Sequence, residues 1–250
     1  MAIHGQQNSF LRRLEFVQVK DCGDVRAPFP AKLLQALKNI WRVEIEDCKS
    51  LEEVFELGEL PDEGRSEEKE LLSSLTELRL VGLPELKYIW KGPTRNVSLQ
   101  SLYILNLSSL NKLTFIFTQS LAQSLPKLGR LEISKCGELK HIIREEDGES
   151  EIIPKSPGFP KLKTIFIEDC GKLECVSLSH NRDDIIKFPQ LRRLSLELGS
   201  NYSFLGPSNF DAQLPLQRLT IKGHEEVGNW LAQLQVRNLY FSTNLNCQLR

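Results

Sequence analysis

The sequence predicts an α/β solenoid in which about nine coils stack and each contributes one strand to a parallel sheet on the concave face. Two observations predict this fold: a phrase that recurs along the whole chain, and the apolar spacing inside each copy of it. If the first leucine of the phrase is position 0, apolar residues recur at positions 0, 3 and 5. All 27 residues at those positions are apolar, in a chain of 250 residues that is only 40% hydrophobic.

Each copy is expected to hold one strand. Positions 3 and 5 flank a residue that points the other way, which is the two-residue period of a strand with one buried face, so position 4 faces outward. Such a unit cannot bury its apolar edge alone and must stack on its neighbours, as in a leucine-rich-repeat solenoid. Position 0 of the nine copies falls at Leu14, Ile40, Leu75, Leu102, Leu128, Leu162, Leu191, Leu216 and Val236.

The return half of each copy is too short for a long helix, and we expect short turns, 3₁₀ pieces or helical pieces on the convex side. Two copies are longer than the others, and their extra residues are acidic and rich in turn formers, near residues 56–71 and 144–158. Insertions of this kind emerge from solenoids as solvated loops. We therefore expect residues 1–250 to form a single domain with two acidic loop insertions.

Position 8 holds a cysteine in four copies. This position lies where the chain turns off the strand into the interior, and a small thiol that tolerates burial and donates weakly suits it. A zinc site or a reactive nucleophile is less favoured, because the repeat sets separations of 26 or 34 residues between these cysteines and no second cysteine pair accompanies Cys170 and Cys175. The predicted turn ladder consists of Cys22, Cys48, Cys136, Cys170 and Asn244.

Composition and motifs exclude several classes of function. The formal charge of −1 provides no global field toward nucleic acid or an anionic membrane surface. No apolar run approaches a membrane span, no secretory signal opens the chain, and the cysteines do not form a disulfide scaffold, so we expect an intracellular protein. We find no catalytic triad, phosphate-binding loop or dinucleotide fingerprint, and we expect neither an enzyme nor a metal site.

The open strand face is the expected functional surface, because its side chains are not used in packing. Acidic residues dominate it in the first three copies, and basic residues dominate it in the last three. Aromatic and arginine side chains, which dominate binding hot spots, are interspersed, although an outward aromatic can also simply pack on its neighbour in the sheet. The candidate partner-binding residues are Trp41, Arg42, Glu44, Arg79, Tyr103, Arg130, Phe166, Arg192, Arg193, Arg218, Lys222, Arg237 and Tyr240.

The phrase L-x-x-L-x-I-x-x-C-x-x-L-x-x-V, best seen in "FPKLKTIFIEDCGKLECV" from Phe159, resembles the C-terminal repeats of plant nucleotide-binding leucine-rich-repeat disease-resistance receptors of the coiled-coil class. The "FP-x-L" lead-in recurs at Phe159 and Phe188, which is also typical of that family. The resemblance covers the chain from Phe10 to Leu249. The chain departs from the family pattern in having neither a coiled-coil segment nor a nucleotide-binding module.

This resemblance implies a cytoplasmic, non-catalytic recognition domain that senses a pathogen effector or a guarded host protein and restrains the nucleotide-binding module. It implies no cofactor for this chain, because ADP or ATP would belong to that module, and we expect a monomer without nucleic acid. The alternative is a substrate adaptor of a ubiquitin ligase, whose repeats also place cysteine here but usually continue into "I-T-D-x-G-L". An extracellular receptor would prefer Asn at position 8 followed by "L-S-G-x-I-P".

Overall fold

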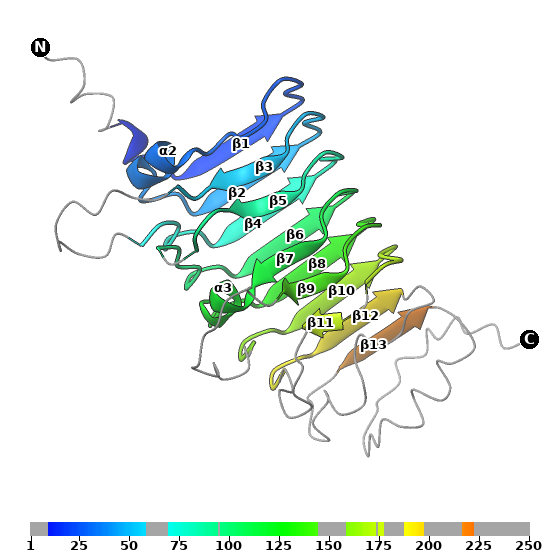
Figure 1. The fold of residues 1–250 in the computed structure, drawn as a ribbon. Coiled ribbons are helices and arrows are strands. Elements are labelled where there is room, and N and C mark those ends of the chain that lie inside the picture. Colours follow the sequence, from blue (N-terminus) through cyan, green and yellow to red (C-terminus); the bar gives the residue numbers. More distant parts are fainter. Residues whose placement is uncertain are drawn as a thin grey trace, which may run out of the picture.

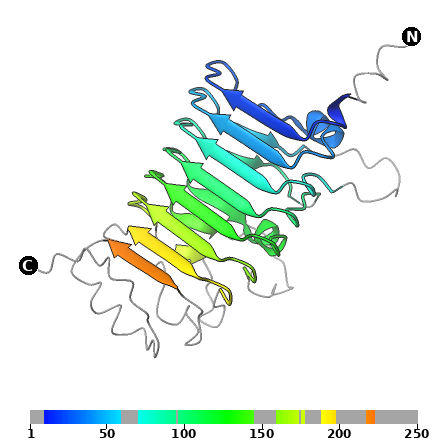
Figure 2. The same ribbon diagram turned by 180° about the vertical axis from the view of Figure 1, so that it is seen from behind.

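The computed structural model describes residues 10–58, 70–94, 96–144, 159–173, 175–177, 188–197 and 217–222. Over these residues the chain winds into successive coils, and each coil adds one strand to a long parallel sheet (Figures 1 and 2). A solenoid is therefore confirmed. The ninth predicted coil, most of both acidic insertions, and Arg237, Tyr240 and Asn244 lie outside the described residues.

The main sheet has eight strands in the order β1-β2-β4-β6-β8-β10-β12-β13, and every neighbouring pair is parallel. Each strand begins at position 2 of its repeat and ends at position 6. The predicted register is thus the observed one across all eight coils. The bounds are β1 Phe16–Lys20, β2 Arg42–Glu46, β4 Glu77–Val81, β6 Ile104–Ser108, β8 Arg130–Ser134, β10 Thr164–Glu168, β12 Arg193–Glu197 and β13 Arg218–Lys222.

The return halves contain short strands as well as the helical pieces that the sequence predicts. The helices are α2 (Ala31–Ala36) and α3 (Gln119–Gln123). The strands, which the pattern did not predict, form one sheet of two strands and one of three: β3 Glu53–Glu56 with β5 Tyr88–Lys91, and β7 Phe115–Thr118 with β9 His141–Arg144 and β11 Cys175–Ser177. Stretches such as Tyr-Ile-Trp in β5 favour an extended chain, and parallel pairing with the next coil satisfies their backbone groups.

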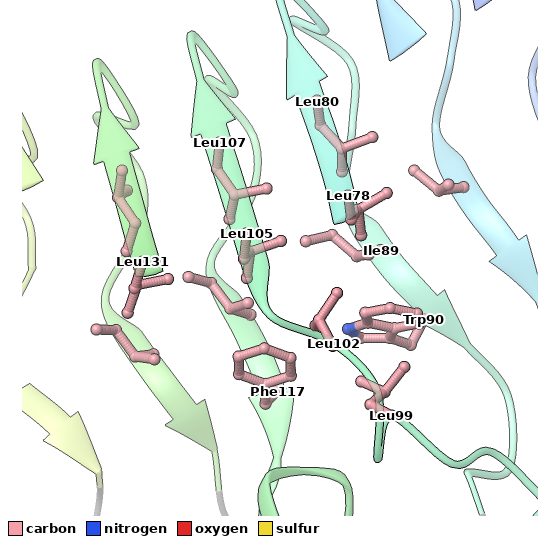
Figure 3. Close-up of a cluster of buried hydrophobic side chains, with 14 of the residues drawn as sticks. Leu78, Leu80, Ile89, Trp90, Leu99, Leu102, Leu105, Leu107, Phe117 and Leu131 are labelled. Carbon is pink, nitrogen blue, oxygen red and sulfur yellow. The ribbon is translucent and has the colours of Figure 1, made fainter. Parts of the chain in front are cut away.

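The core lies between the two layers of strands. Leucines at positions 3 and 5 point inward from the main sheet and meet side chains from the return strands, as Figure 3 shows for Leu78, Leu105, Ile89 and Phe117. All four are at most 1% exposed. Burying each such side chain contributes about 1.5–3 kcal/mol, so the stack of coils supplies its own driving force.

Aromatic rings form a column inside this core. Phe29, Phe55, Trp90 and Phe117 occupy the same place in successive coils, with ring centroids 5.3, 5.0 and 6.4 Å apart along the series. Trp90 is 6% exposed, and its indole N–H has no hydrogen-bond partner among the described residues. The column ties four coils together through their return halves.

In the first six coils, the turn that leaves the strand has a left-handed residue at position 7. In the first five of them, its N–H donates to the position 6 carbonyl of the next coil, as from Asp21 to Glu46 at 3.0 Å and from Lys135 to Glu168 at 2.9 Å. This turn prepares the chain to enter the interior at position 8. With φ between 52° and 65°, the residues are Asp21, Asp47, Gly82, Ser109, Lys135 and Asp169.

The cysteines at position 8 lie in two pairs of neighbouring coils, Cys22 with Cys48 and Cys136 with Cys170, and leucines occupy this position in the two coils between the pairs. Each thiol donates to the carbonyl oxygen two residues earlier, at 3.3 or 3.4 Å, and thereby occupies a backbone acceptor at the turn. Cys48, Cys136 and Cys170 are buried, and Cys22 in the first coil is half-buried. All four are free thiols.

Candidate functional site

The outer face of the main sheet is formed by positions 2, 4 and 6 of the eight strands and by position 1, the residue directly before each strand. Because the register is one to one, each position makes a column of neighbouring side chains across the coils. The position 4 column contains Gln18, Glu44, Arg79, Asn106, Glu132, Phe166, Ser195 and Thr220. We call this surface the outer face.

Glu44 lies at the centre of a network at the N-terminal end of the outer face. Its carboxylate accepts hydrogen bonds from Arg42 and, at 2.7 Å, from Gln18, and the residue is only 6% exposed. Burial acts to raise the pKa of Glu44, but the hydrogen bonds from Arg42 and Gln18 outweigh it, so that its pKa lies below the ordinary value. Glu44 is therefore covered by its neighbours and offers little surface to a partner.

Glu46 links two further cations of the same region. Lys20 Nζ lies 2.7 Å from its carboxylate, and the buried Nε of Arg79 lies 3.1 Å away in ion-pair rather than hydrogen-bond geometry. Arg42 also lies 3.6 Å from Glu77. The acidic side chains at positions 2, 4 and 6 in the strands of the first three coils, Glu44, Glu46 and Glu77, are thus each paired with a cation of the same surface.

The middle of the outer face is also paired. Glu132 accepts hydrogen bonds from Asn106 at 2.6 Å and from the Nε of Arg130 at 2.7 Å. Ser134 and Ser108 share a hydrogen bond of 2.8 Å in the next column. Arg130 is therefore committed to its own strand.

Exposed aromatic side chains lie where the strands begin. Tyr103 is 45% exposed and Trp41 is 38% exposed, both at position 1. The ring of Tyr103 lies over Gly129, where an added Cβ would meet its Cε2 atom at 2.2 Å. Glycine at position 129 thus lets this ring lie close to the backbone of the next coil.

The C-terminal part of the described outer face carries a basic cluster, which we define as Lys163, Arg192, Arg193 and Arg218. All four side chains are exposed, and none pairs with an acidic side chain among the described residues. Arg193 and Arg218 are direct partners in the register of β12 and β13. Arg192 and Lys163 lie at position 1 of adjacent coils, joined by a 2.9 Å hydrogen bond from the N–H of Arg192 to the carbonyl of Lys163.

The structure therefore separates the predicted residues into three groups. Arg42, Glu44, Arg79 and Arg130 are used in pairs within the face. A second group has exposed or half-buried side chains and no charged partner in the described chain: Trp41, Tyr103, Phe166, Arg192, Arg193 and Arg218. Lys222 ends β13 but its side chain is not described, and Arg237 and Tyr240 lie outside the described residues.

Two residues of this surface were missed by the sequence analysis. Lys163 belongs to the basic cluster and occupies position 1 of the sixth repeat, directly after the buried Leu162. Gly129 determines where Tyr103 lies, and no feature of a single repeat indicates this. Position 1 of one coil has to be compared with position 1 of the next before the contact can be seen.

No metal centre is found in the part of the chain that the structure describes. No group of three or more His, Cys, Asp or Glu side chains could hold a metal ion there. Burial raises the pKa of the Cys48 thiol, and a hydrogen bond with Cys170 together with burial raises that of Cys136, so both remain protonated and unreactive near neutral pH. No helix among the described residues has the length and apolar character needed to cross a membrane.

Comparison with known proteins agrees with this arrangement. The leucine-rich repeats of the family described as plant disease resistance protein RPS2-like match residues 2–137. A probable disease resistance protein of Arabidopsis thaliana is 29% identical over 117 residues, covering 45% of this chain and 12% of that protein. The chain thus spans only a small part of the length of that relative.

A solved structure of the leucine-rich repeat domain of the type III effector XopL is 17% identical, with a TM-score of 0.35. The matched region covers 85% of this chain and 79% of the XopL chain. The fold assignment stands on the parallel register of the main sheet.

Proposed function

Because this chain belongs to the family of RPS2-like leucine-rich repeats of plant disease resistance proteins, we propose that it is the recognition domain of an intracellular plant immune receptor. A protein-interaction role in defence follows from the family, whose leucine-rich-repeat domains are generally non-catalytic. The finer proposal is that the chain binds a pathogen effector or a guarded host protein and restrains a nucleotide-binding module. ADP or ATP would be held by that module, and the receptor would act in the cytoplasm.

The family match to more than half of the chain carries this proposal. The outer face supports it, because exposed aromatic and cationic side chains stand on a rigid sheet whose packing they do not serve. Aromatic and arginine side chains bury much area for little lost freedom, and they are enriched at protein interfaces. A broad surface of this kind suits a protein better than a small molecule, which binds in a concave pocket.

The test is co-expression in plant leaf of the tagged chain with a coiled-coil and nucleotide-binding fragment of an RPS2-like resistance protein. We expect the fragment to co-purify with the chain and the cell death that it triggers to be reduced. A chain carrying Leu105→Asp and Leu131→Asp, which places two carboxylates in the core, is the control that should lose both effects. If the intact chain neither associates with the fragment nor restrains it, the proposed function is wrong.

A further inference from the structure

We propose that the basic cluster docks an extended acidic segment of the partner protein, with Tyr103 as the apolar anchor at one end of the contact. This inference rests on the proposed function, since it specifies the chemistry of the partner that a recognition domain would bind.

Charge pairing differs along the outer face. Arg42, Arg79 and Arg130 each contact a carboxylate of the outer face, so their charges are compensated within the molecule. The four cations of the basic cluster have no such partner among the described side chains. Like charges side by side on neighbouring strands are destabilising, and an anionic ligand would relieve this repulsion.

The basic cluster forms a row along the starts of neighbouring strands. Its residues occupy positions 1 and 2 of three consecutive coils, where the N–H groups of Arg192 and Arg193 both donate to Lys163. Neighbouring strands lie about 4.8 Å apart, so the row from Tyr103 in the fourth coil to Arg218 in the eighth extends over roughly 19 Å. An extended chain covers that distance with roughly six residues.

Tyr103 packs closely against the next coil. Its ring covers Gly129 at a distance that leaves no space for a Cβ atom, while 45% of the residue remains exposed. A ring fixed in this way loses little freedom on binding, which is the property of a hot-spot residue. The ring lies toward the basic cluster, because Gly129 belongs to the coil between Tyr103 and Lys163.

A protein segment fits this surface better than a nucleic acid. The chain as a whole carries a formal charge of −1, so no long-range field concentrates a polyanion around it. A short acidic segment can be matched by the four cations of the basic cluster, whereas a nucleic acid requires a more extended positive surface to neutralise its phosphates.

The experiment measures binding of a fluorescein-labelled peptide by anisotropy. The probe has six alternating Glu and Asp residues and one terminal Phe, and a peptide with Gln and Asn in place of the acids is its control. We expect the acidic probe to bind at about 50 mM salt and to weaken severalfold at about 200 mM, since exposed charges are screened over that range. Arg193→Glu with Arg218→Glu should weaken it by roughly tenfold or more.

A matched variant, Lys38→Glu with Lys140→Glu, makes the same change in net charge at two exposed lysines outside the outer face. It should leave affinity within about twofold, since charges farther apart than a Debye length are largely screened. Tyr103→Ala and Gly129→Ala should each weaken the Phe-containing probe, but not a probe with Gly in place of Phe. The charge-reversal variants and Tyr103→Ala should keep a free energy of unfolding within about 1 kcal/mol of that of the unchanged protein. Gly129→Ala is the exception, and it tests the contact between Tyr103 and Gly129 by changing the glycine instead of the ring.

Three results would overturn the inference: equal binding of the acidic and amide probes, equal losses in the two charge-reversal variants, or tighter binding of a single-stranded RNA of matched charge. If the acidic probe fails while the chain still associates with the nucleotide-binding fragment, only this inference is wrong. If the probe binds as expected and the fragment does not associate, the restraint of that module is wrong instead.

Discussion

Replacing Lys135 with glycine should stabilise the protein, although glycine usually weakens a folded chain. Lys135 has a φ of 54°, in the left-handed region where an L-residue with a Cβ is strained by about 1–2 kcal/mol. Glycine removes that strain, but its greater freedom in the unfolded chain costs about 0.5–1 kcal/mol. The balance is a gain of up to about 1.5 kcal/mol in the free energy of unfolding.

The substitution leaves the other interactions at this turn intact. The side chain of Lys135 is exposed, and its backbone N–H, which donates to the carbonyl of Glu168 at 2.9 Å, is kept by glycine. The denaturation midpoint in urea, followed by circular dichroism, should therefore rise without a change in slope.

Two comparison variants isolate the cause. Lys140 is exposed but is not among the residues with positive φ, so Lys140→Gly should lower the free energy of unfolding by about 0.5–1 kcal/mol. Gly82 has a φ of 65°, and an added Cβ would lie 2.1 Å from Oδ1 of Asp47, so Gly82→Ala should also be destabilising. If Lys135→Gly lowers the midpoint as Lys140→Gly does, the left-handed turn does not strain its residue and our account of the turn is mistaken.

Three further predictions concern the interior and the paired end of the outer face. The pKa of Glu44 is lowered in the folded state, so its contribution to stability should be present above the ordinary Glu pKa of about 4.3 and be lost as pH falls through the lower folded value. Glu44→Gln should therefore be less stable than the unchanged protein at about pH 7. Acid titrations of unfolding should show this difference in stability shrinking toward about pH 3. Trp90→Phe should change the free energy of unfolding by less than about 1 kcal/mol, because the lost side-chain volume is offset by removal of an indole N–H that has no partner. Trp90→Ala should lower the free energy of unfolding by about 3–5 kcal/mol in the same denaturation assay. A thiol reagent should label the buried Cys48, Cys136 and Cys170 slowly in the native protein and quickly in the urea-unfolded protein. Rapid labelling of any of them in the native protein would contradict their structural role.

Most of the fold could be predicted because its determinants lie within one repeat. The apolar residues at positions 0, 3 and 5 fix which face of each strand is buried, and a slip of one residue would expose them all. Leu105 and Leu107 flank Asn106 in this pattern, and both are fully or almost fully buried while Asn106 is not. The same alternation placed Phe166 on the outer face.

The return strands could not be predicted from a single repeat. Segments such as Tyr88–Lys91 have four residues, and four residues with apolar character fit a turn, a helical piece or a strand equally well. Pairing with the next coil decides in favour of the strand, and this pairing becomes visible only when the coils are placed side by side.

The candidate site was harder to predict because it depends on contacts between coils. The sequence indicated an acidic N-terminal end of the face, but Glu44 and Glu46 are neutralised by Arg42, Lys20 and Arg79. Arg79 is 33 residues from Glu46 along the chain, and only the register brings the two together. Charge counted from the sequence therefore overstated what the surface offers to a partner.

The one-to-one register of the main sheet persists although the repeats that form it range in length from 25 to 35 residues. Length variation is absorbed in the return halves, so insertions and deletions there leave the spacing of the outer-face columns unchanged. Point substitutions at positions 1, 2, 4 and 6 can likewise alter one column without disturbing the leucines beneath it. A lineage carrying this architecture can change what it binds by single substitutions, on a lattice whose geometry stays constant.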